Sequence, residues 1–425
     1  MYTLIIIGFG ISGISCAFHS KLNNINFIVL EQQSSFGGCW NDKAFDFTRL
    51  QTDSNIYRFM NYNKSMNRHP TKGELLNYMS NYINRFNLLD NVLFNSKVID
   101  VEFNSYWTIE FNYNNTTRKI TSKYLIVCNG ILNKPNIPSF NRKNLYLNKI
   151  YHSSEIKSKN LKLLHDKKIL VVGNGATGLD LSAHLAPTNK IILLHRKPKF
   201  ILNNTIFHVP SSFLISRITL NQIKNYPLWF FLILIHILLK FFYRNYLAIP
   251  QEKPTSKNVL ANNNFIRLVN DKKILYIQDN IKRFTKDTVI LKSGKYLKVD
   301  LVLLATGYKQ EIPFMKKFKL SQYRYKYIID PNIHNCAFIG HCSAYNWLQI
   351  SEIQSIWYIN VILGNIKLPA YSIFKKDINI RKQKNTEYYD LTYEAFDYCD
   401  ELLNDIKYNR HIIKDLGYWL CKPLF

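Results

Sequence analysis

Two glycine-rich turns with the same internal spacing constrain this 425-residue chain more than any other feature. The two turns are Gly8-Phe-Gly10-Ile-Ser12-Gly13 and Gly173-Asn-Gly175-Ala-Thr177-Gly178. Each follows an apolar run and precedes a helix-compatible stretch, which is the order of strand, turn and helix in a dinucleotide-binding βαβ unit. One such turn arises readily by chance in unrelated folds. Two turns with the same spacing predict an α/β protein with two Rossmann-like domains.

Each glycine of such a turn has a separate physical task. The first allows a tight turn, the second lets the backbone approach a pyrophosphate, and the third allows the helix to pack closely on the strand. The N-terminus of the helix adds free N–H groups and partial positive charge. We therefore expect contacts to dinucleotides from Gly8, Gly10, Ser12 and Gly13 in the first turn, and from Gly173, Gly175, Thr177 and Gly178 in the second.

The residue that closes the second strand of each unit indicates which dinucleotide is bound. It lies 23 positions after the first glycine and is Glu31 in the first unit and Arg196 in the second. A carboxylate accepts hydrogen bonds from ribose hydroxyls and repels a 2′-phosphate, so Glu31 fits FAD or NAD. The run His195-Arg196-Lys197 would attract a 2′-phosphate and favours NADP. The alternative is two ordinary βαβ turns with an exposed acid and an exposed base.

Composition limits the partners of the chain. The formal net charge of +27 would suit nucleic acid or an anionic membrane surface. The basic residues are spread along the whole chain, however, and no nucleic-acid-binding motif occurs, so we expect no nucleic-acid partner. The seven cysteines form no C-x-x-C pair. Their spacing suggests neither a metal site nor a disulfide framework, which fits a reducing cytosol.

One apolar segment leaves the relation to membranes open. Residues 226–244 contain an apolar run that is shorter than the about 20 residues a membrane span needs, and His236 lies within it. Lys224, Lys240 and Arg244 flank the run as they would flank a helix at an anionic bilayer surface. The alternative is a buried helix, or one that lines a substrate cavity. We expect a cytoplasmic protein, with peripheral membrane contact through 226–244 as an open alternative and the oligomeric state undetermined.

The pattern of apolar runs predicts three sequential regions. They are residues 1–160 with the first dinucleotide unit, residues 161–300 with the second unit and an apolar insert at about 210–250, and residues 301–425. The second domain is thus inserted into the first, whose last strands come from the C-terminal third. We expect helices within 70–89, 350–363 and 386–406, and strands at 92–94, 98–102, 107–111, 124–128, 274–278, 288–291, 299–304 and 337–340.

Further motifs resemble those of the flavin-containing monooxygenases, the class B enzymes that include the plant auxin-forming type. Gly37-Gly38-Cys39-Trp40 is similar to the Gly-Gly-x-Trp element of this family, and Ala305-Thr306-Gly307-Tyr308 is similar to its ATGY element. The resemblance implies FAD at the first turn and NADPH at the second. It also implies FAD contacts from Glu31, Gly38, Trp40, Gly130, Gly340 and Gln354, and NADPH contacts from His195, Arg196, Lys197, Thr306 and Gly307.

The resemblance further implies a reaction. NADPH would reduce the flavin, O2 would give a C4a-hydroperoxyflavin, and one oxygen atom would pass to a small molecule with a soft nitrogen or sulfur nucleophile. N,N-dimethylaniline monooxygenase activity is of this kind. No metal takes part, and the protein supplies binding, orientation and exclusion of water.

Two departures from the family pattern leave alternatives open. Asp53 stands where the family often has an active-site Asn, so the catalytic candidates are Asp53 and the nearby Asn55. The family signature is degenerate over residues 146–156, where His152 is kept but the terminal aromatic is Ile156. The alternatives are an NADPH oxidase that releases hydrogen peroxide, and a non-catalytic flavoprotein that only binds its cofactors.

Overall fold

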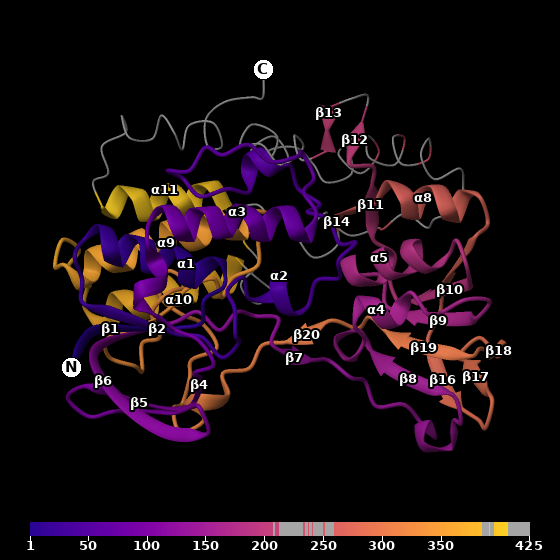
Figure 1. Ribbon diagram of the computed structural model, residues 1–425, viewed down its shortest axis with the longest axis horizontal. Helices are drawn as coiled ribbons and strands as arrows, with labels where there is room; N and C mark the ends of the chain where they lie inside the picture. The colour runs from indigo at the N-terminus through magenta and orange to yellow at the C-terminus, as the bar shows by residue number, and fades with distance from the viewer. Residues whose placement is uncertain are drawn as a thin grey trace. The chain divides into compact units, whose positions relative to one another are not determined.

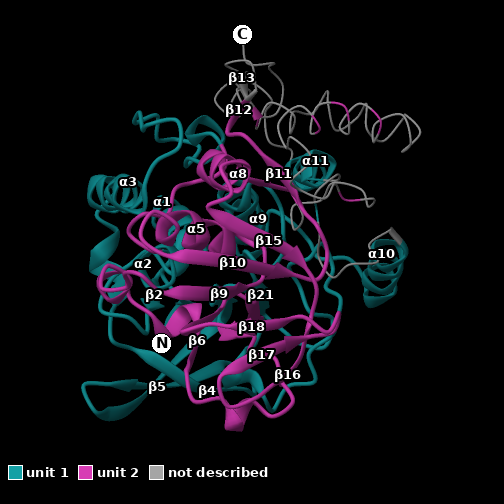
Figure 2. Ribbon diagram, turned by 90° about the vertical axis from the view of Figure 1, so that its right-hand side faces the viewer, with its two compact units in different colours: residues 1–44, 53–133, 310–425 teal, residues 45–52, 134–309 magenta. Residues whose placement is uncertain are grey.

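The computed structural model describes residues 1–206, 209–211, 259–384 and 395–406, together with Ile233, Ile237, Lys240, Pro250 and Leu391. The chain forms two compact units (Figure 2). Unit 1 contains Met1–Ala44, Asp53–Asn133 and Gln310–Phe425, and unit 2 contains Phe45–Thr52 and Lys134–Lys309. The chain thus enters unit 2 twice, briefly over residues 45–52 and then over residues 134–309, and returns to unit 1 each time.

Unit 1 is built on a seven-stranded sheet with the order β3-β2-β1-β6-β5-β4, in which β21 also pairs with β6. The strands are β1 (Tyr2–Ile7), β2 (Phe27–Leu30), β3 (Val92–Leu93), β4 (Lys97–Phe103), β5 (Trp107–Tyr113), β6 (Thr116–Val127) and β21 (Cys336–Phe338). β1 pairs in parallel with β2 and β6, whereas β4, β5 and β6 form an antiparallel meander. The apolar runs of β1, β2 and β21 are buried, as expected for parallel strands that are covered on both faces.

The helices of unit 1 are α1 (Ile11–Leu22), α2 (Cys39–Asp42), α3 (Lys72–Arg85), α9 (Trp347–Ile362), α10 (Tyr371–Lys384) and α11 (Ala395–Asp405). A capping box of Thr71 and Glu74 starts α3. α1 and α9 lie side by side, although more than 300 residues separate them in the sequence (Figure 1). Residues 348–359 of α9 are all buried, so this helix forms part of the core of unit 1.

Unit 2 is built on a parallel five-stranded sheet with the order β15-β10-β9-β19-β8. The strands are β8 (Lys149–His152), β9 (Lys168–Val172), β10 (Lys190–His195), β15 (Ile274–Gln278) and β19 (Leu301–Leu304). Successive side chains of a strand point to opposite faces. Accordingly Ile169 and Val171 pack in one apolar cluster with residues of α5 (Ala176–Leu185) and α8 (Asn263–Asn270). Leu170 packs in a second cluster with residues of β16 (Ile281–Phe284) and β17 (Thr288–Leu291).

The smaller elements of unit 2 complete this arrangement. They are an antiparallel sheet of β16 (Ile281–Phe284), β17 (Thr288–Leu291) and β18 (Tyr296–Lys298), the helix α4 (Ser158–Leu161), and the strand pairs β11 (Phe200–Leu202) with β14 (Val259–Ala261), β12 (Thr205–Ile206) with β13 (Val209–Pro210), and β7 (Lys134–Pro135) with β20 (Tyr308–Lys309). β7 and β20 therefore bring together the two ends of the long segment of unit 2, residues 134–309.

The α/β fold class predicted from the sequence is confirmed. β15 and β17 have the predicted bounds, and α3 and α9 lie at the predicted places. β6 begins at Thr116, eight residues before its predicted start, and α10 was not predicted. The predicted helix over 386–406 corresponds to α11, and its first part lies largely outside the described residues. β8 pairs with β19 in unit 2, whereas the division drawn from the sequence assigned residues up to 160 to the first domain.

The predicted membrane-contact segment at 226–244 lies outside the described residues, except for Ile233, Ile237 and Lys240. Ile233 is 52% exposed and Ile237 is 65% exposed. Over the part of the chain that the structure describes, no helix combines the length and apolar character needed to cross a bilayer.

Candidate dinucleotide-binding sites

The first glycine turn leaves no room for side chains at two of its three glycines. Gly8 has a φ of +100°, and a Cβ atom there would lie 2.7 Å from the carbonyl oxygen of Cys128. A Cβ atom on Gly13 would lie 1.9 Å from the carbonyl oxygen of Gly8. Gly10 is the N-cap of α1, and no acidic residue lies in the first turn of this helix. The N-terminus of α1 is therefore suited to a phosphate group.

The Gly-Gly-x-Trp element lies directly against this turn. The N–H of Gly37 donates a hydrogen bond of 3.0 Å to the carbonyl oxygen of Phe9. A Cβ atom on Gly38, whose φ is +53°, would lie 3.1 Å from the Cα atom of Gly10. The indole N–H of Trp40 donates a 3.0 Å hydrogen bond to the hydroxyl of Tyr57. The fold thus brings together two motifs that the sequence analysis identified separately.

Glu31 is held at the end of β2 by backbone N–H groups. Its Oε2 atom accepts a 2.6 Å hydrogen bond from the N–H of Phe9, and its Oε1 atom accepts a 2.8 Å bond from the N–H of Gln33. Glu31 is 5% exposed, and this burial raises the pKa of its carboxyl group while the backbone hydrogen bonds oppose the rise. A carboxylate oxygen can accept more than one hydrogen bond, so acceptor sites remain for a ribose hydroxyl.

A second turn, after β21, completes the surroundings of the first glycine turn. Gly340 has a φ of +73°, and a Cβ atom there would lie 2.1 Å from Oγ of Ser12. Oγ of Ser12 donates a 3.0 Å hydrogen bond to Oγ of Ser351 on α9. The N–H of Gly340 donates a 2.9 Å hydrogen bond to Oε1 of Gln354. Gly130, which follows β6, also has a positive φ of +70°.

The glycine turn of unit 2 repeats the geometry of the first. Gly173 has a φ of +109°, and its Cβ atom would lie 2.4 Å from the carbonyl oxygen of Ala305. A Cβ atom on Gly178 would lie 1.9 Å from the carbonyl oxygen of Gly173. Around Gly175, the N-cap of α5, a Cβ atom would meet nothing within 4 Å. The chain therefore leaves open space at the glycine that would face a pyrophosphate, and Thr177 is partly exposed in the first turn of α5.

The basic run at the end of β10, residues 195–197, contains one neutral and two charged side chains. His195 is 3% exposed and stacks on Tyr276 at a ring-centroid distance of 4.0 Å. Burial lowers the pKa of His195 to about 4, so its ring is neutral at pH 7. Arg196 and Lys197 are exposed, and the guanidinium group of Arg196 has no partner among the described side chains. The positive charge that could meet a 2′-phosphate therefore comes from Arg196 and Lys197.

Asn174 holds this basic turn in place. Its Nδ2 group donates a 2.9 Å hydrogen bond to the carbonyl oxygen of Lys197 and a 2.8 Å bond to the hydroxyl of Tyr276. Asn174 stands at a variable position of the glycine motif and Tyr276 lies on a later strand, and neither was predicted as a site residue. The only sign of Asn174 in the sequence was its position between Gly173 and Gly175. Its hydrogen-bond partners could not be predicted, because they depend on the tertiary fold.

Thr306 and Gly307 belong to a hydrogen-bonded junction of unit 2. Oγ1 of Thr306 donates a 2.6 Å hydrogen bond to the carbonyl oxygen of Asn136, so this hydroxyl is used within the protein. Gly307 is exposed and has a φ of +76°. Its carbonyl oxygen lies 3.1 Å from Nε2 of His152, while Nδ1 of His152 lies 2.8 Å from Oγ of Ser154. Both ring nitrogens of His152 are therefore engaged in internal hydrogen bonds.

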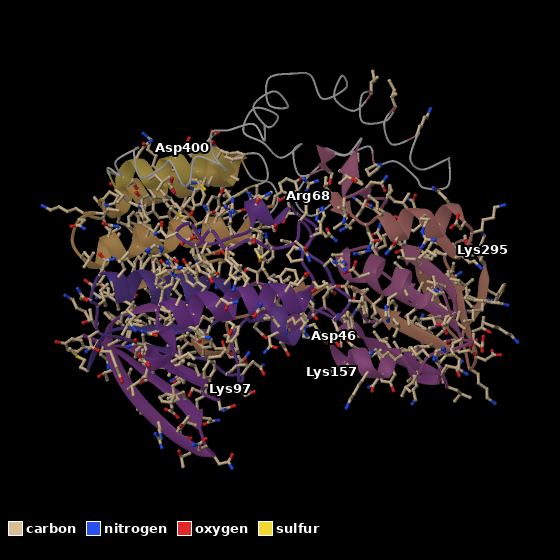
Figure 3. All side chains as sticks on the ribbon, turned by 45° about the horizontal axis from the view of Figure 1, so that its top comes forward. Asp46, Arg68, Lys97, Lys157, Lys295 and Asp400 are labelled. Carbon is tan, nitrogen blue, oxygen red and sulfur yellow. The ribbon has the colours of Figure 1, made fainter. Side chains whose placement is uncertain are left out.

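The two catalytic candidates have different surroundings. Asp53 is 1% exposed, and its Oδ1 atom accepts a 2.8 Å hydrogen bond from the N–H of Asn55. Its Oδ2 atom lies 3.3 Å from Nε of Arg68, whose side chain is labelled in Figure 3. Asp53 thus caps a short helix and pairs with a cation, whereas Asn55 is exposed. Within the described residues, no group of His, Cys, Asp and Glu side chains could hold a metal ion.

Comparison with known proteins identifies the class and then the family. The two dinucleotide-type turns, one with a buried glutamate and one with an exposed arginine, define the class of α/β proteins with two Rossmann-like domains. The flavin-binding monooxygenase-like family model matches residues 2–414. The chain therefore belongs to this family, as its motifs predict. It is a flavin-dependent monooxygenase, and its cofactors are FAD and NADPH.

Individual relatives are distant but span almost the whole chain. A putative flavin-containing monooxygenase 2 from Arabidopsis thaliana is 23% identical over 94% of this chain and 96% of its own length. A 4-hydroxybenzoate brominase (decarboxylating) from Pseudoalteromonas luteoviolacea is 24% identical over 99% of this chain and 84% of its own length. The crystal structure of OTEMO in complex with FAD and NADP has a TM-score of 0.73 at 14% identity and covers 96% of this chain and 98% of that chain. At this identity, the structural similarity speaks for the fold alone.

Proposed function

We propose that unit 1 holds FAD at the turn of Gly8, unit 2 holds NADPH at the turn of Gly173, and the enzyme transfers one oxygen atom from O2 to a small molecule with a soft nitrogen or sulfur nucleophile. The observation that carries the cofactor assignment is the contrast between two turns of the same geometry. Glu31 is buried and held by backbone N–H groups, whereas Arg196 is exposed and unpaired among the described residues.

In unit 1, the chain's own groups would bind and orient FAD. Gly8, Gly10, Ser12 and Gly13 would place the N-terminus of α1 at the pyrophosphate, and Glu31 would accept hydrogen bonds from the adenosine ribose. Residues of three nearby segments would complete the site, namely Gly38 and Trp40, Gly130, and Gly340 with Gln354. When bound, the flavin supplies the redox and oxygen-transfer chemistry, while these residues fix its position and exclude water.

In unit 2, the same arrangement would bind NADPH. Gly173, Gly175, Thr177 and Gly178 would bind the pyrophosphate, and Arg196 with Lys197 would bind the 2′-phosphate. His195 would contribute as a neutral ring that packs on Tyr276, and Thr306 and Gly307 would act as a structural boundary of the site.

The candidates for a role in the reaction itself are Asp53 and Asn55 of unit 1. The carboxylate of Asp53 is balanced by the guanidinium group of Arg68.

The coenzyme assignment is tested with Arg196→Ala. A charge-assisted hydrogen bond contributes about 1.5–3 kcal/mol, so the KM for NADPH should rise at least tenfold while the KM for NADH changes little. The measurement is steady-state NADPH and NADH oxidation by the holoenzyme. Lys273→Ala, which removes another exposed cation of unit 2, is the matched control and should leave both KM values unchanged. Equal losses for both coenzymes would exclude a 2′-phosphate contact.

The oxygen-transfer step is tested by following NADPH, hydrogen peroxide and product together in the wild-type enzyme with amines and thioethers. Oxygenated product in proportion to NADPH consumed supports the proposal. Hydrogen peroxide in proportion to NADPH, without product from either substrate class, would instead identify an NADPH oxidase. FAD binding without NADPH oxidation would identify the non-catalytic flavoprotein, and folded protein that takes up no FAD would contradict both enzyme assignments.

A further inference from the structure

The helix α11 is connected to the turn of Gly340 by a buried chain of hydrogen bonds. We propose that Tyr398 on α11 is a positioning residue of the flavin site, which acts through Gln354 to hold Gly340 against the first turn of α1. This inference rests on the proposed binding of FAD at the turn of Gly8. It assigns a role in flavin binding to a helix that carries no cofactor-binding motif.

The chain of contacts begins beside the proposed pyrophosphate site. Gly340 lies so close to Ser12 that a Cβ atom would approach Oγ of Ser12 to 2.1 Å. Ser12 is in the first turn of α1, whose N-terminus would face the pyrophosphate. A shift of Gly340 would therefore change the packing of this first turn.

Gln354 links this turn to α11 with both ends of its amide. Its Oε1 atom accepts a 2.9 Å hydrogen bond from the N–H of Gly340, and its Nε2 group donates a 2.8 Å bond to the hydroxyl of Tyr398. Gln354 is 0% exposed, so bulk solvent does not reach its amide. An amide fits a site only when its oxygen meets a donor and its nitrogen meets an acceptor. The hydroxyl of Tyr398 therefore orients the amide so that the oxygen faces Gly340.

Among the described residues, the amide nitrogen of Gln354 has one further contact, which is weak. Nε2 of Gln354 lies 3.6 Å from Sγ of Cys342, and a sulfur atom is a poor hydrogen-bond acceptor. Loss of the hydroxyl of Tyr398 would thus leave the amide without a strong partner that distinguishes its two ends. The Gln354 side chain would then be free to rotate away from Gly340.

Tyr398 is itself held in a fixed position. Its hydroxyl donates a 2.7 Å hydrogen bond to the carbonyl oxygen of Lys326. Lys326 and Tyr327 have positive φ values of +49° and +56°, which fix the direction of this carbonyl group. Nζ of Lys326 lies 2.7 Å from Glu401 and 2.8 Å from Asp405, both on α11. The same helix thus supplies the hydroxyl and the ion pairs that hold its acceptor.

The test is the rate of FAD release from Tyr398→Phe holoenzyme, followed by flavin fluorescence after dilution. A lost buried hydrogen bond is worth about 0.5–1.5 kcal/mol, so we expect FAD to leave about 2- to 12-fold faster. NADP binding in unit 2 should not change. Tyr82→Phe is the matched control, because the Tyr82 hydroxyl is buried in unit 1 without a hydrogen-bond partner in the structure as described. This variant should release FAD at the wild-type rate.

A double-mutant cycle with Gln354→Leu separates positioning from a general loss of stability. If Tyr398 acts through Gln354, Tyr398→Phe should have little further effect on FAD release in the Gln354→Leu background. Additive effects would overturn the proposal. So would an unchanged release rate in Tyr398→Phe, even if its urea unfolding midpoint falls. Failure of the wild-type protein to bind FAD would instead contradict the proposed function. The two failures are distinguishable, because this one is observed in the wild type and the other only in the variants.

Discussion

At the scale of single residues, the glycine turns distinguish positions that the fold requires from a position that a cofactor would require. In Gly178→Ala, the new Cβ atom would lie 1.9 Å from a backbone oxygen, so we expect a loss of about 3 kcal/mol or more in the free energy of unfolding. In Gly175→Ala, the Cβ atom meets nothing within 4 Å. This variant should unfold like the wild type but bind NADPH at least tenfold more weakly. Urea unfolding and NADP titration measure the two effects.

Gly73→Ala is the matched control for this pair. Gly73 lies in the first turn of α3 with nothing within 4 Å of a built Cβ atom. Alanine there should stabilise the protein by about 0.5–1 kcal/mol and leave NADP binding unchanged. Wild-type NADP affinity in Gly175→Ala would mean that the pyrophosphate does not approach this glycine.

The same scale shows what the sequence could predict about single side chains. The spacing of the motifs was sufficient to identify Glu31 and Arg196, because a βαβ unit places the end of its second strand beside the turn. The spacing did not predict that His195 is neutral. The sequence placed this residue in a basic run with Arg196 and Lys197. Tyr276, which buries that ring, lies on a strand that is distant in sequence, and burial of this kind depends on tertiary packing.

At the scale of elements, Asp180 connects three parts of unit 2. It lies on α5 and accepts a 2.8 Å hydrogen bond from Asn262, whose side chain also caps α8, and a hydrogen bond with Thr48 links it to the segment 45–52. Burial raises the pKa of Asp180 to about 7. The folded carboxyl group therefore keeps its proton to higher pH than the unfolded one, so its contribution to stability falls as the pH rises from about 4 to about 7.

Asp180→Asn should remove this pH dependence, because an amide oxygen can still accept from Asn262 but carries no charge. The free energy of unfolding of the wild type should be about 2–3 kcal/mol lower at about pH 8 than at about pH 5, as far as Asp180 determines it. The variant should not show this decrease. Urea unfolding at the two pH values measures this difference. Asp271→Asn, at a residue whose side chain is 52% exposed, is the control and should follow the wild type. Parallel pH profiles of Asp180→Asn and the wild type would contradict the assignment.

Elements were predictable where apolar residues dominate their sequence. β15 and β17 are short apolar strands, and their predicted bounds agree with the structure. β16 and α10 carry many charged residues, so their sequences have no clear apolar period and neither was predicted. β8 was read as part of a degenerate family signature, because its role as an edge strand depends on pairing with β19, about 150 residues later.

At the scale of the whole molecule, the positions of the two glycine turns predicted that one dinucleotide unit interrupts the other. The exact division could not be predicted, because it depends on pairings such as that of β7 with β20.

The net charge is also a property of the whole molecule. The excess of basic residues extends over both units, as Lys97 in unit 1 and Lys157 and Lys295 in unit 2 illustrate (Figure 3). Such a chain should associate with anionic surfaces in a salt-dependent manner.

The combination of this charge with the apolar segment at 226–244 leads to a prediction about membranes. Ile233 and Ile237 are exposed large apolar residues, and transfer of such side chains into a bilayer surface is favourable. The double variant Ile233→Glu/Ile237→Glu should therefore bind anionic vesicles at least tenfold more weakly than the wild type in a flotation assay. Binding by the wild type should also weaken as salt is added, because the screening length shortens.

Leu163→Glu provides the control for this experiment, since Leu163 is 78% exposed in unit 2 outside the apolar segment. It adds one negative charge and removes one exposed leucine, so any loss of vesicle binding that reflects charge or general hydrophobicity should appear in it as well. A loss confined to the variant at 233 and 237 would assign membrane contact to the segment. Equal binding by all three proteins would show that only the diffuse positive charge attracts the vesicle.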